Sequence, residues 1–382
     1  MGDPCVFGNL KTDPKVEEAI EKALRSKEGN GYSVNIAGYT KGLNAIAKKY
    51  GTIDAPIDPN KDVFFTNGVS HALELVMQAL GGQGKNILTP RPGFSLYKCL
   101  AENAGMQHRY YDLSAAKGWE VDFDQAKSQI DENTVAILVN NPSNPCGSNY
   151  SKSHLIEILE FARISCIPVI SDEIYADMTW AWTEDEDPNS YPLATLSAQD
   201  SRDKGLKEVV PVITVNGLAK KYLVPGWRCG WITIFDPMDY LSEIRMGIVN
   251  LLNKIMACSG ILQCALDDIF TNTPESFFQS TNQLLESHAR LIVDEIKSIA
   301  GLHVIIPRGA LYVMITIDLE RFPEYKTDIE FTAALVKEES VFVLPGTCFG
   351  LGSSMRIVTS APSDMLKQAM DRMKAFIERH IV

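Results

Sequence analysis

One lysine of the pair Lys220 and Lys221 has the type and position that most directly suggest chemistry. It lies in Leu-Ala-Lys-Lys-Tyr-Leu-Val-Pro-Gly-Trp-Arg (218–228), shortly after the apolar run Val209–Val215. Burial disfavours the charged form of a lysine, and the neutral amine is a nucleophile that attacks carbonyl groups. Paired lysines are also common in exposed loops, so this interpretation depends on which groups lie nearby.

A carboxylate follows a second apolar run. Asp172 in Ser-Asp-Glu-Ile-Tyr (171–175) comes soon after Ile167–Ile170, and Tyr175 follows three residues later. A carboxylate at the tip of a central strand is costly to desolvate unless it meets a cation or a hydrogen-bond donor. Asp172 is therefore a candidate site residue, and the alternative is an aspartate that caps a helix.

Two loops offer further polar groups. Residues 66–70, Thr-Asn-Gly-Val-Ser, open a helix, and the free N–H groups of a helix N-terminus favour an anion near Gly68, Val69 and Ser70. The loop Asn-Pro-Ser-Asn-Pro-Cys-Gly (141–147) is made rigid by two prolines and could aim Asn144 inward. A plain N-cap and a structural turn are the alternatives.

Taken together, these groups match the needs of pyridoxal phosphate. That cofactor requires an anion site, a carboxylate for its pyridinium nitrogen, a donor for its ring oxygen and an amine for its aldehyde. The carboxylate would keep the ring nitrogen protonated, so that the ring can accept electrons from a carbanion. The four segments thus predict one cofactor site.

The elements that must position these residues form an α/β fold. Apolar runs of strand length alternate with helical patterns, which predicts a large domain with a mostly parallel seven-stranded sheet covered on both faces. Ligands of such sheets bind at the carboxyl ends of the strands. The expected strands are Val63–Phe65, Asn86–Thr89, Gln107–Tyr111, Val135–Asn140, Ile167–Ile170, Val209–Val215 and Trp231–Ile234.

The pattern changes after about residue 274, and a smaller α/β domain is expected there. We expect residues 30–274 to form the large domain, and residues 1–29 and 275–382 to form the small one. The helix expected over Lys15–Ser26 has no sheet partner nearby in the sequence and is assigned to the small domain. The expected strands of that domain are Val304–Pro307, Leu311–Ile317, Val341–Leu344 and Arg356–Thr359.

Composition excludes several other classes of protein. The 382 residues include 36 Lys and Arg against 48 Asp and Glu, a net charge of −12 that argues against a nucleic-acid partner. No apolar run is long enough for a transmembrane helix, and the N-terminus lacks a secretory signal pattern. The 8 cysteines form no C-x-x-C pair, so we expect no metal site and a cytoplasmic protein with reduced thiols.

The sequence resembles the class I aminotransferases among the fold-type I pyridoxal-phosphate enzymes, most closely the tyrosine aminotransferase branch. The match runs along essentially the whole chain. The segments that carry it are Gly-Asp-Pro (2–4), Asn-Gly-Tyr (30–32), Arg-Pro-Gly-Phe-Ser-Leu-Tyr (91–97), Asn-Pro-Ser-Asn-Pro-Cys-Gly (141–147), Asp-Glu-Ile-Tyr (172–175), Val-Pro-Gly-Trp-Arg (224–228), Arg-Gly-Ala-Leu-Tyr (308–312) and Met-Arg-Ile-Val (355–358).

The resemblance implies a role for each matching residue. Lys220 would bond to the cofactor aldehyde and shuttle the substrate proton, Asp172 would pair with the pyridinium nitrogen, and Tyr175 and Asn144 would bind the ring oxygen. Phe94 would stack on the ring, while Val69, Ser70 and Arg228 would hold the phosphate. Arg356 would clamp the substrate α-carboxylate, with Gly2 near the substrate. Tyr32 would reach the phosphate of a neighbouring subunit, which implies a homodimer with shared sites.

The implied reaction moves the amino group of an aromatic L-amino acid to a 2-oxo acid such as 2-oxoglutarate by a ping-pong route. Alternatives are an alanine or broad-specificity aminotransferase and a cysteine-S-conjugate β-lyase, or, from another class, a regulator that binds the cofactor without catalysis. One position departs from the family pattern. Gly217 stands where many relatives have a phosphate-binding serine.

Overall fold

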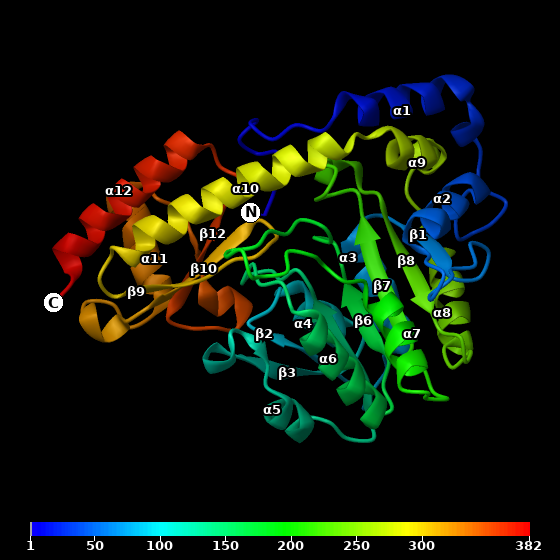
Figure 1. The fold of residues 1–382 in the computed structure, drawn as a ribbon, viewed down its shortest axis with the longest axis horizontal. Helices are drawn as coiled ribbons and strands as arrows, with labels where there is room; N and C mark the ends of the chain where they lie inside the picture. The colour runs from blue at the N-terminus through cyan, green and yellow to red at the C-terminus, as the bar shows by residue number, and fades with distance from the viewer. Residues whose placement is uncertain (1) are drawn as a thin grey trace.

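A computed structural model describes residues 2–382, which build two β-sheets flanked by helices (Figure 1). The large sheet has eight strands in the order β1-β8-β7-β6-β5-β2-β3-β4. The five neighbours β7, β6, β5, β2 and β3 pair in parallel, while β1, β8 and β4 join antiparallel. The strands are β1 Val63–Thr66, β2 Asn86–Arg91, β3 Gln107–Ser114, β4 Glu120–Val121, β5 Thr134–Asn140, β6 Val169–Asp172, β7 Val212–Gly217 and β8 Gly230–Phe235.

Helices cover both faces of this sheet. In β5, Ala136 and Leu138 join the core beneath α3, whereas Ile137 and Val139 join the core beneath α6 and α7. A strand buried on both faces has no polar alternation, which explains the continuous apolar run of its sequence. The helices are α1 Pro14–Ser26, α2 Thr40–Tyr50, α3 Val69–Leu80, α4 Leu96–Asn103, α5 Phe123–Ser128, α6 Lys152–Ile164, α7 Leu193–Asp203, α8 Ser242–Leu252, α9 Gly260–Asn272, α10 Glu275–Lys297, α11 Asp328–Glu339 and α12 Ser363–His380.

The smaller sheet is antiparallel and has four strands in the order β11-β12-β10-β9. These are β9 Leu302–Ile305, β10 Tyr312–Ile317, β11 Leu344–Pro345 and β12 Ser354–Val358. Its core includes apolar residues of α10, α11 and α12. The long helix α10 begins near α9 and extends to the small sheet, so it connects the two parts of the molecule (Figure 1).

The predicted fold class is confirmed, with one difference in the number of strands. The large sheet has eight strands and not seven, because the two-residue edge strand β4 pairs with the end of β3. A strand this short has no periodicity that a sequence pattern can reveal. Among residues 2–382, no helix combines the length and apolar character needed to cross a bilayer.

Helix α1 packs against the large sheet's part of the molecule. Its buried residues Val16, Ala19 and Ala23 share the core of the large sheet, and the helix packs along α9 (Figure 1). The apolar face of α1 thus has a partner more than 200 residues away in the sequence, which no local pattern indicates. The domain assignments, residues 30–274 for the large domain and residues 1–29 with 275–382 for the small one, stay predictions.

Candidate active site

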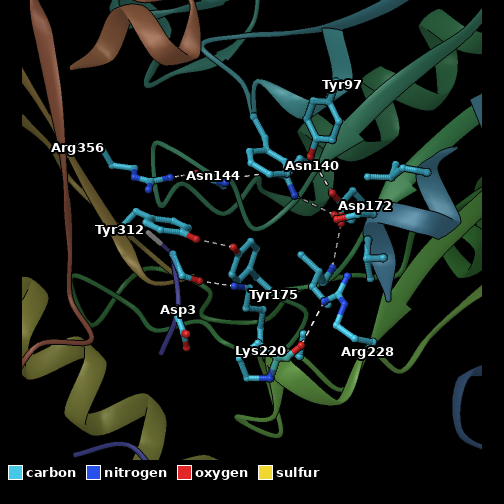
Figure 2. A pocket seen from close by; sticks show the side chains of 18 of the residues that line it. Asp3, Tyr97, Asn140, Asn144, Asp172, Tyr175, Lys220, Arg228, Tyr312 and Arg356 are labelled. Carbon is cyan, nitrogen blue, oxygen red and sulfur yellow. Dashed lines mark hydrogen bonds between the residues drawn. The ribbon is translucent and has the colours of Figure 1, made fainter. Parts of the chain in front are cut away.

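A cavity of about 530 Å³ lies where the carboxyl ends of the large sheet meet the small sheet. Asn140 ends β5, Asp172 ends β6, and Lys220 lies just after β7. From the small sheet, Tyr312 begins β10 and Arg356 lies within β12 (Figure 2). Residues that are hundreds of positions apart thus line one cavity, at the sheet edge where ligands of parallel sheets are expected.

Asp172 forms the buried floor of the cavity. Its Oδ2 accepts a hydrogen bond of 2.7 Å from the Tyr97 hydroxyl, and its Oδ1 accepts one of 3.3 Å from the Ile174 amide. Burial raises the pKa of the Asp172 carboxyl to about 6, although the two hydrogen bonds and the charge of Lys220 oppose this shift. A carboxylate that is hard to ionise alone is well suited to meet a cation.

Lys220 points into the same cavity. Its ammonium donates to the Gly2 carbonyl and lies 6.0 Å from the centre of the Tyr175 ring (Figure 2). The adjacent Lys221 points elsewhere and pairs with Asp177 at 2.5 Å. The two lysines left open by the sequence motif are therefore distinguished by direction, and only Lys220 lines the cavity.

Arg356 is buried opposite this floor. Its Nη1 donates a 2.7 Å hydrogen bond to Asn144 Oδ1, and its guanidinium lies over the rings of Tyr312 and Phe349 at 4.2 and 4.6 Å. Within the described residues 2–382, its Nε has no hydrogen-bond partner. Burial lowers the pKa of this guanidinium from its usual value. A buried cation that lines a cavity and has no carboxylate partner among these residues is a natural site for an anionic ligand.

Asn144 is held in place by the loop that the two prolines make rigid. The backbone N–H of Asn144 donates to Asn140 Oδ1 at 2.8 Å. The side-chain Nδ2 of Asn140 in turn donates to the Asp172 backbone carbonyl at 3.1 Å. The end of β5 is thereby tied to the end of β6. The chain of contacts from Asp172 through Asn140 and Asn144 to Arg356 connects the two sheets (Figure 2).

The third side of the cavity is an anion site at the start of α3. Gly68 precedes the helix with φ of 80°, and the Arg228 guanidinium donates to the Asn67 carbonyl at 3.3 Å. Val69 and Ser70 line the cavity together with Arg228. The first N–H groups of a helix and an arginine fork form a typical phosphate site.

Glycines permit the strands behind this anion site to pack closely. A Cβ on Gly230 would lie 2.7 Å from the Gly68 carbonyl carbon, and one on Gly217 would lie 2.7 Å from the Cys229 carbonyl oxygen. A serine at residue 217 would therefore force β7 and β8 apart. The present spacing of β7 and β8 therefore requires glycine at residue 217, the position where the resemblance suggested a hydroxyl.

Most of the predicted site residues do line this one cavity. They are Gly2, Val69, Ser70, Phe94, Asn144, Asp172, Tyr175, Lys220, Arg228 and Arg356. Gly68 supplies the turn beneath Arg228. Tyr32 is different, because it is 86% exposed and is not among the lining residues. Its predicted contact with a second subunit stays a prediction.

Tyr97, Asn140 and Tyr312 are among the lining residues that were not predicted as site residues. Tyr97 and Tyr312 end two of the segments that carried the family resemblance, and Asn140 ends the predicted strand before the proline loop. The segments were therefore visible in the sequence. Which of their side chains face the cavity depends on how α4, β5 and β10 pack.

The cavity residues fit pyridoxal phosphate when tested on their own geometry. The anion site at α3, the buried Asp172 carboxyl and the Lys220 amine lie on different sides of one cavity. Phe94 lines it as well and meets Tyr97 edge to face at 5.7 Å between ring centres. The cavity therefore has a suitable group for each part of the cofactor: its anionic phosphate, its ring nitrogen cation, its aldehyde and its flat ring.

Comparison with known proteins points the same way. Residues 1–373 match the protein family described as aminotransferase class I and II. The chain is 44% identical over 381 residues to a tyrosine aminotransferase from Mus musculus, covering 100% of this chain and 80% of that protein.

Solved structures of similar fold also include aminotransferases. A tyrosine aminotransferase from Leishmania infantum has a TM-score of 0.91 at 33% identity, covering 100% of this chain and 91% of the other. An alanine aminotransferase from Pyrococcus furiosus has a TM-score of 0.89 at 31% identity, covering 99% and 91%.

Proposed function

The chain is an aminotransferase of the class I and II family, and from this membership we propose that it moves the amino group of an aromatic L-amino acid to a 2-oxo acid such as 2-oxoglutarate. The observation that carries the proposal is the convergence of Lys220, Asp172 and Arg356 on one cavity. The 44% identity to a tyrosine aminotransferase supports the aromatic class of substrate. The aromatic lining, which includes Phe94 and Tyr312, is consistent with it.

The proposed cofactor is pyridoxal phosphate. When bound, it supplies an aldehyde that bonds to an amine and a ring that withdraws electrons from the substrate Cα. Val69, Ser70 and Arg228 would bind its phosphate, and Phe94 would lie against its ring. Asp172 would hold a proton on the ring nitrogen, because an ion pair with that cation offsets the cost of its buried charge.

Lys220 would be the base and acid of the reaction. Its amine would take the proton from the substrate Cα and return it to the cofactor carbon that receives the amino group. Tyr175 and Asn144 would bind the ring oxygen and so stabilise its negative charge.

Arg356 would orient each substrate through its α-carboxylate. The amino donor and the oxo-acid acceptor carry the same carboxylate, so one guanidinium can bind them in turn. This shared binding site supports the ping-pong route, in which the first product leaves before the second substrate enters. We also propose a homodimer in which the exposed Tyr32 reaches the partner's phosphate site. The cytoplasmic location stays a prediction.

Alanine is a second candidate donor, because a structure with a TM-score of 0.89 is an alanine aminotransferase. A screen of amino acids on the cofactor-loaded protein would separate the two. We expect tyrosine or phenylalanine to change the visible absorption of the bound cofactor fastest, and 2-oxoglutarate to restore it. If alanine changed the absorption fastest, alanine would replace the aromatic amino acid as the proposed donor. Pyruvate release from cystathionine without an oxo acid would indicate β-elimination instead.

The role of Lys220 has a matched control in the next residue. Lys220→Ala should abolish turnover, whereas Lys221→Ala should leave it near the wild-type rate, since Lys221 pairs with Asp177 outside the cavity. Unchanged turnover in Lys220→Ala would exclude the proposed mechanism.

A further inference from the structure

Two tyrosine hydroxyls meet at the boundary between the sheets. Tyr175 follows β6 of the large sheet, and Tyr312 begins β10 of the small one. Their hydroxyl oxygens are 2.7 Å apart, and the rings meet edge to face at 5.7 Å (Figure 2). Both side chains are buried, at 3% and 2% exposure. Among residues 2–382, the only hydrogen-bond partner of the Tyr312 hydroxyl is Tyr175.

The surroundings of Tyr312 favour it as the donor in this pair. The Arg356 guanidinium lies 4.2 Å from the centre of the Tyr312 ring. A cation at that distance draws electron density from the ring and makes its O–H a stronger donor. The Gly2 backbone closes the space beside the Tyr312 hydroxyl, since a Cβ on Gly2 would overlap it.

If Tyr312 donates, the proton of Tyr175 is left free. A hydroxyl has one proton and two acceptor lone pairs, so Tyr175 can accept from Tyr312 and still donate in another direction. Tyr175 lines the cavity alongside Lys220 and Asp172, so a ligand bound there can accept this proton. Burial also keeps the proton on this oxygen, because it raises the pKa of Tyr175 well above its usual value.

We propose that Tyr312 is a positioning residue: its hydroxyl orients the Tyr175 hydroxyl so that Tyr175 donates to the ring oxygen of the bound cofactor. The inference rests on the proposed function and adds to it a residue of the small sheet. Donation from Tyr312 polarises the Tyr175 O–H and so strengthens the hydrogen bond from Tyr175 to the ring oxygen of the cofactor.

The test is Tyr312→Phe in the cofactor-loaded protein. The ring stays beneath Arg356 and only the hydroxyl is lost. A weaker hydrogen bond to the ring oxygen stabilises its anionic state less, so the bound cofactor keeps its proton to higher pH. We expect the midpoint of the pH-dependent visible absorption change to rise by about half a pH unit. The KM for the amino donor should remain close to wild type, since the Arg356 contact is retained.

Two further variants distinguish positioning from a general structural effect. Tyr325→Phe removes a hydroxyl of the small domain that bonds His380 at 3.2 Å, and it should leave the midpoint unchanged. In a Tyr175→Phe background, Tyr312→Phe should have no further effect, because it acts through the Tyr175 hydroxyl. An unchanged midpoint in the single variant, an equal shift in both backgrounds, or a change confined to KM would each overturn the inference.

Failure of the proposed function would look different. If the wild-type protein bound pyridoxal phosphate but no amino acid changed its spectrum, transamination would be refuted while the pH midpoints could still be compared. If the wild type showed no cofactor absorption after loading, both the function and this inference would be excluded.

Discussion

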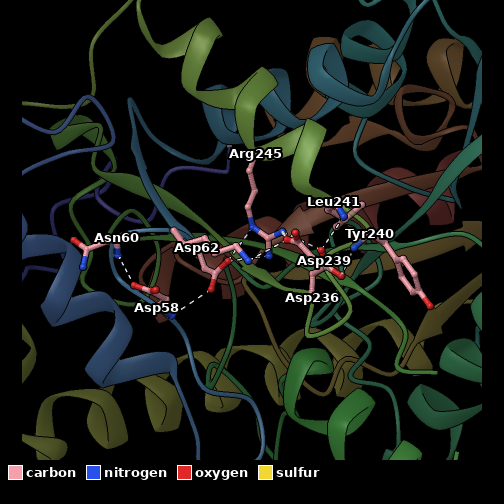
Figure 3. A network of polar contacts seen from close by, with 9 residues as sticks. Asp58, Asn60, Asp62, Asp236, Asp239, Tyr240, Leu241 and Arg245 are labelled. Atoms are coloured by element: carbon pink, nitrogen blue, oxygen red, sulfur yellow. Dashed lines mark hydrogen bonds and ion pairs between the residues drawn. The ribbon is translucent and has the colours of Figure 1, made fainter. Parts of the chain in front are cut away.

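Two buried arginines among residues 2–382, Arg245 in α8 and Arg356 in β12, have opposite surroundings. They are 6% and 5% exposed. Arg245 meets Asp62 at 2.8 Å, Asp236 at 2.9 Å and Asp239 at 3.2 Å (Figure 3). Arg356 meets no carboxylate within residues 2–382, and only Asn144 accepts from it.

The difference teaches which buried charge is structural and which is available to a ligand. A buried charge is costly unless it is paired, and the Arg245 cation is already paired with carboxylates within the fold. The Arg356 guanidinium has aromatic faces and an amide around it but no carboxylate among residues 2–382, so its charge is available to a carboxylate from outside. Burial alone does not distinguish the two residues, whereas their partners do.

The largest effect is expected from Arg245→Met. It removes the cation from Asp62 and Asp236 and leaves buried carboxylates without their partner, which should cost about 3–5 kcal/mol of unfolding free energy. Urea unfolding measures the loss. The activity of the remaining folded protein should be near wild type, because Arg245 does not line the cavity. A destabilisation below about 1 kcal/mol would mean that the cluster is not structural.

Arg356→Met should have the converse effect. Loss of the bidentate partner for a carboxylate is expected to cut kcat/KM for the amino donor by about 10²- to 10³-fold, equivalent to about 3–4 kcal/mol. The unfolding free energy should change by no more than about 1 kcal/mol, since the loss of one charge-assisted hydrogen bond is offset by removing a buried cation that has no carboxylate partner. If stability fell as far as in Arg245→Met while activity persisted, the comparison would be refuted.

Without the cofactor's ring cation beside it, the buried Asp172 carboxyl should make the unfolding free energy depend on pH. Its pKa in the folded, cofactor-free protein is about 6, above the unfolded value near 3.9, so the fold binds the proton more tightly. The stabilisation is fully present below about pH 4 and is lost as pH rises through 6, amounting to about 2–3 kcal/mol.

Asp172→Asn removes this titration, so its unfolding free energy should fall less between pH 4 and pH 8 than that of the wild type. Glu173→Gln serves as the comparison, because burial also raises the pKa of Glu173, to about 7. Cofactor loading should flatten the wild-type slope and that of Glu173→Gln, if Asp172 alone meets the ring cation. Identical slopes for Asp172→Asn and wild type would rule out this titration.

The smallest effect is expected from Arg245→Lys. The charge remains, but a point cation cannot reproduce the fork that contacts Asp62 and Asp236 together, so a loss of about 1 kcal/mol is expected. Thermal unfolding of Arg245→Lys and Arg245→Met, measured side by side, would rank the stability of the two variants. A lysine variant as unstable as the methionine variant would show that geometry, and not charge, holds the cluster.

The sequence predicted more of the large sheet than of the contacts between sheets. Asp172 and Asn144 follow apolar runs that end at one edge of a parallel sheet, and this rule alone predicts that they lie close together. The Arg356–Asn144 contact does not follow from it, because that contact joins residues 212 positions apart on two sheets. The family resemblance implies a role for both residues, but it does not imply that they touch.

Three features escaped sequence reasoning for identifiable physical reasons. Strand β4 is too short to show a period, and the partner of α1 is the distant helix α9. The meeting of Tyr312 with Tyr175 depends on how the smaller sheet packs against the larger. Local patterns report which face of an element is apolar, but they do not report which distant face it will meet.

The close packing at Gly217 and Gly230 has a consequence for how this fold can diversify. A Cβ at either residue would meet main-chain atoms of a neighbouring segment, so an added side chain cannot adjust ligand affinity gradually; it must spread the strands. Variation in which substrate is accepted is therefore expected elsewhere in the cavity lining, while this corner stays constant.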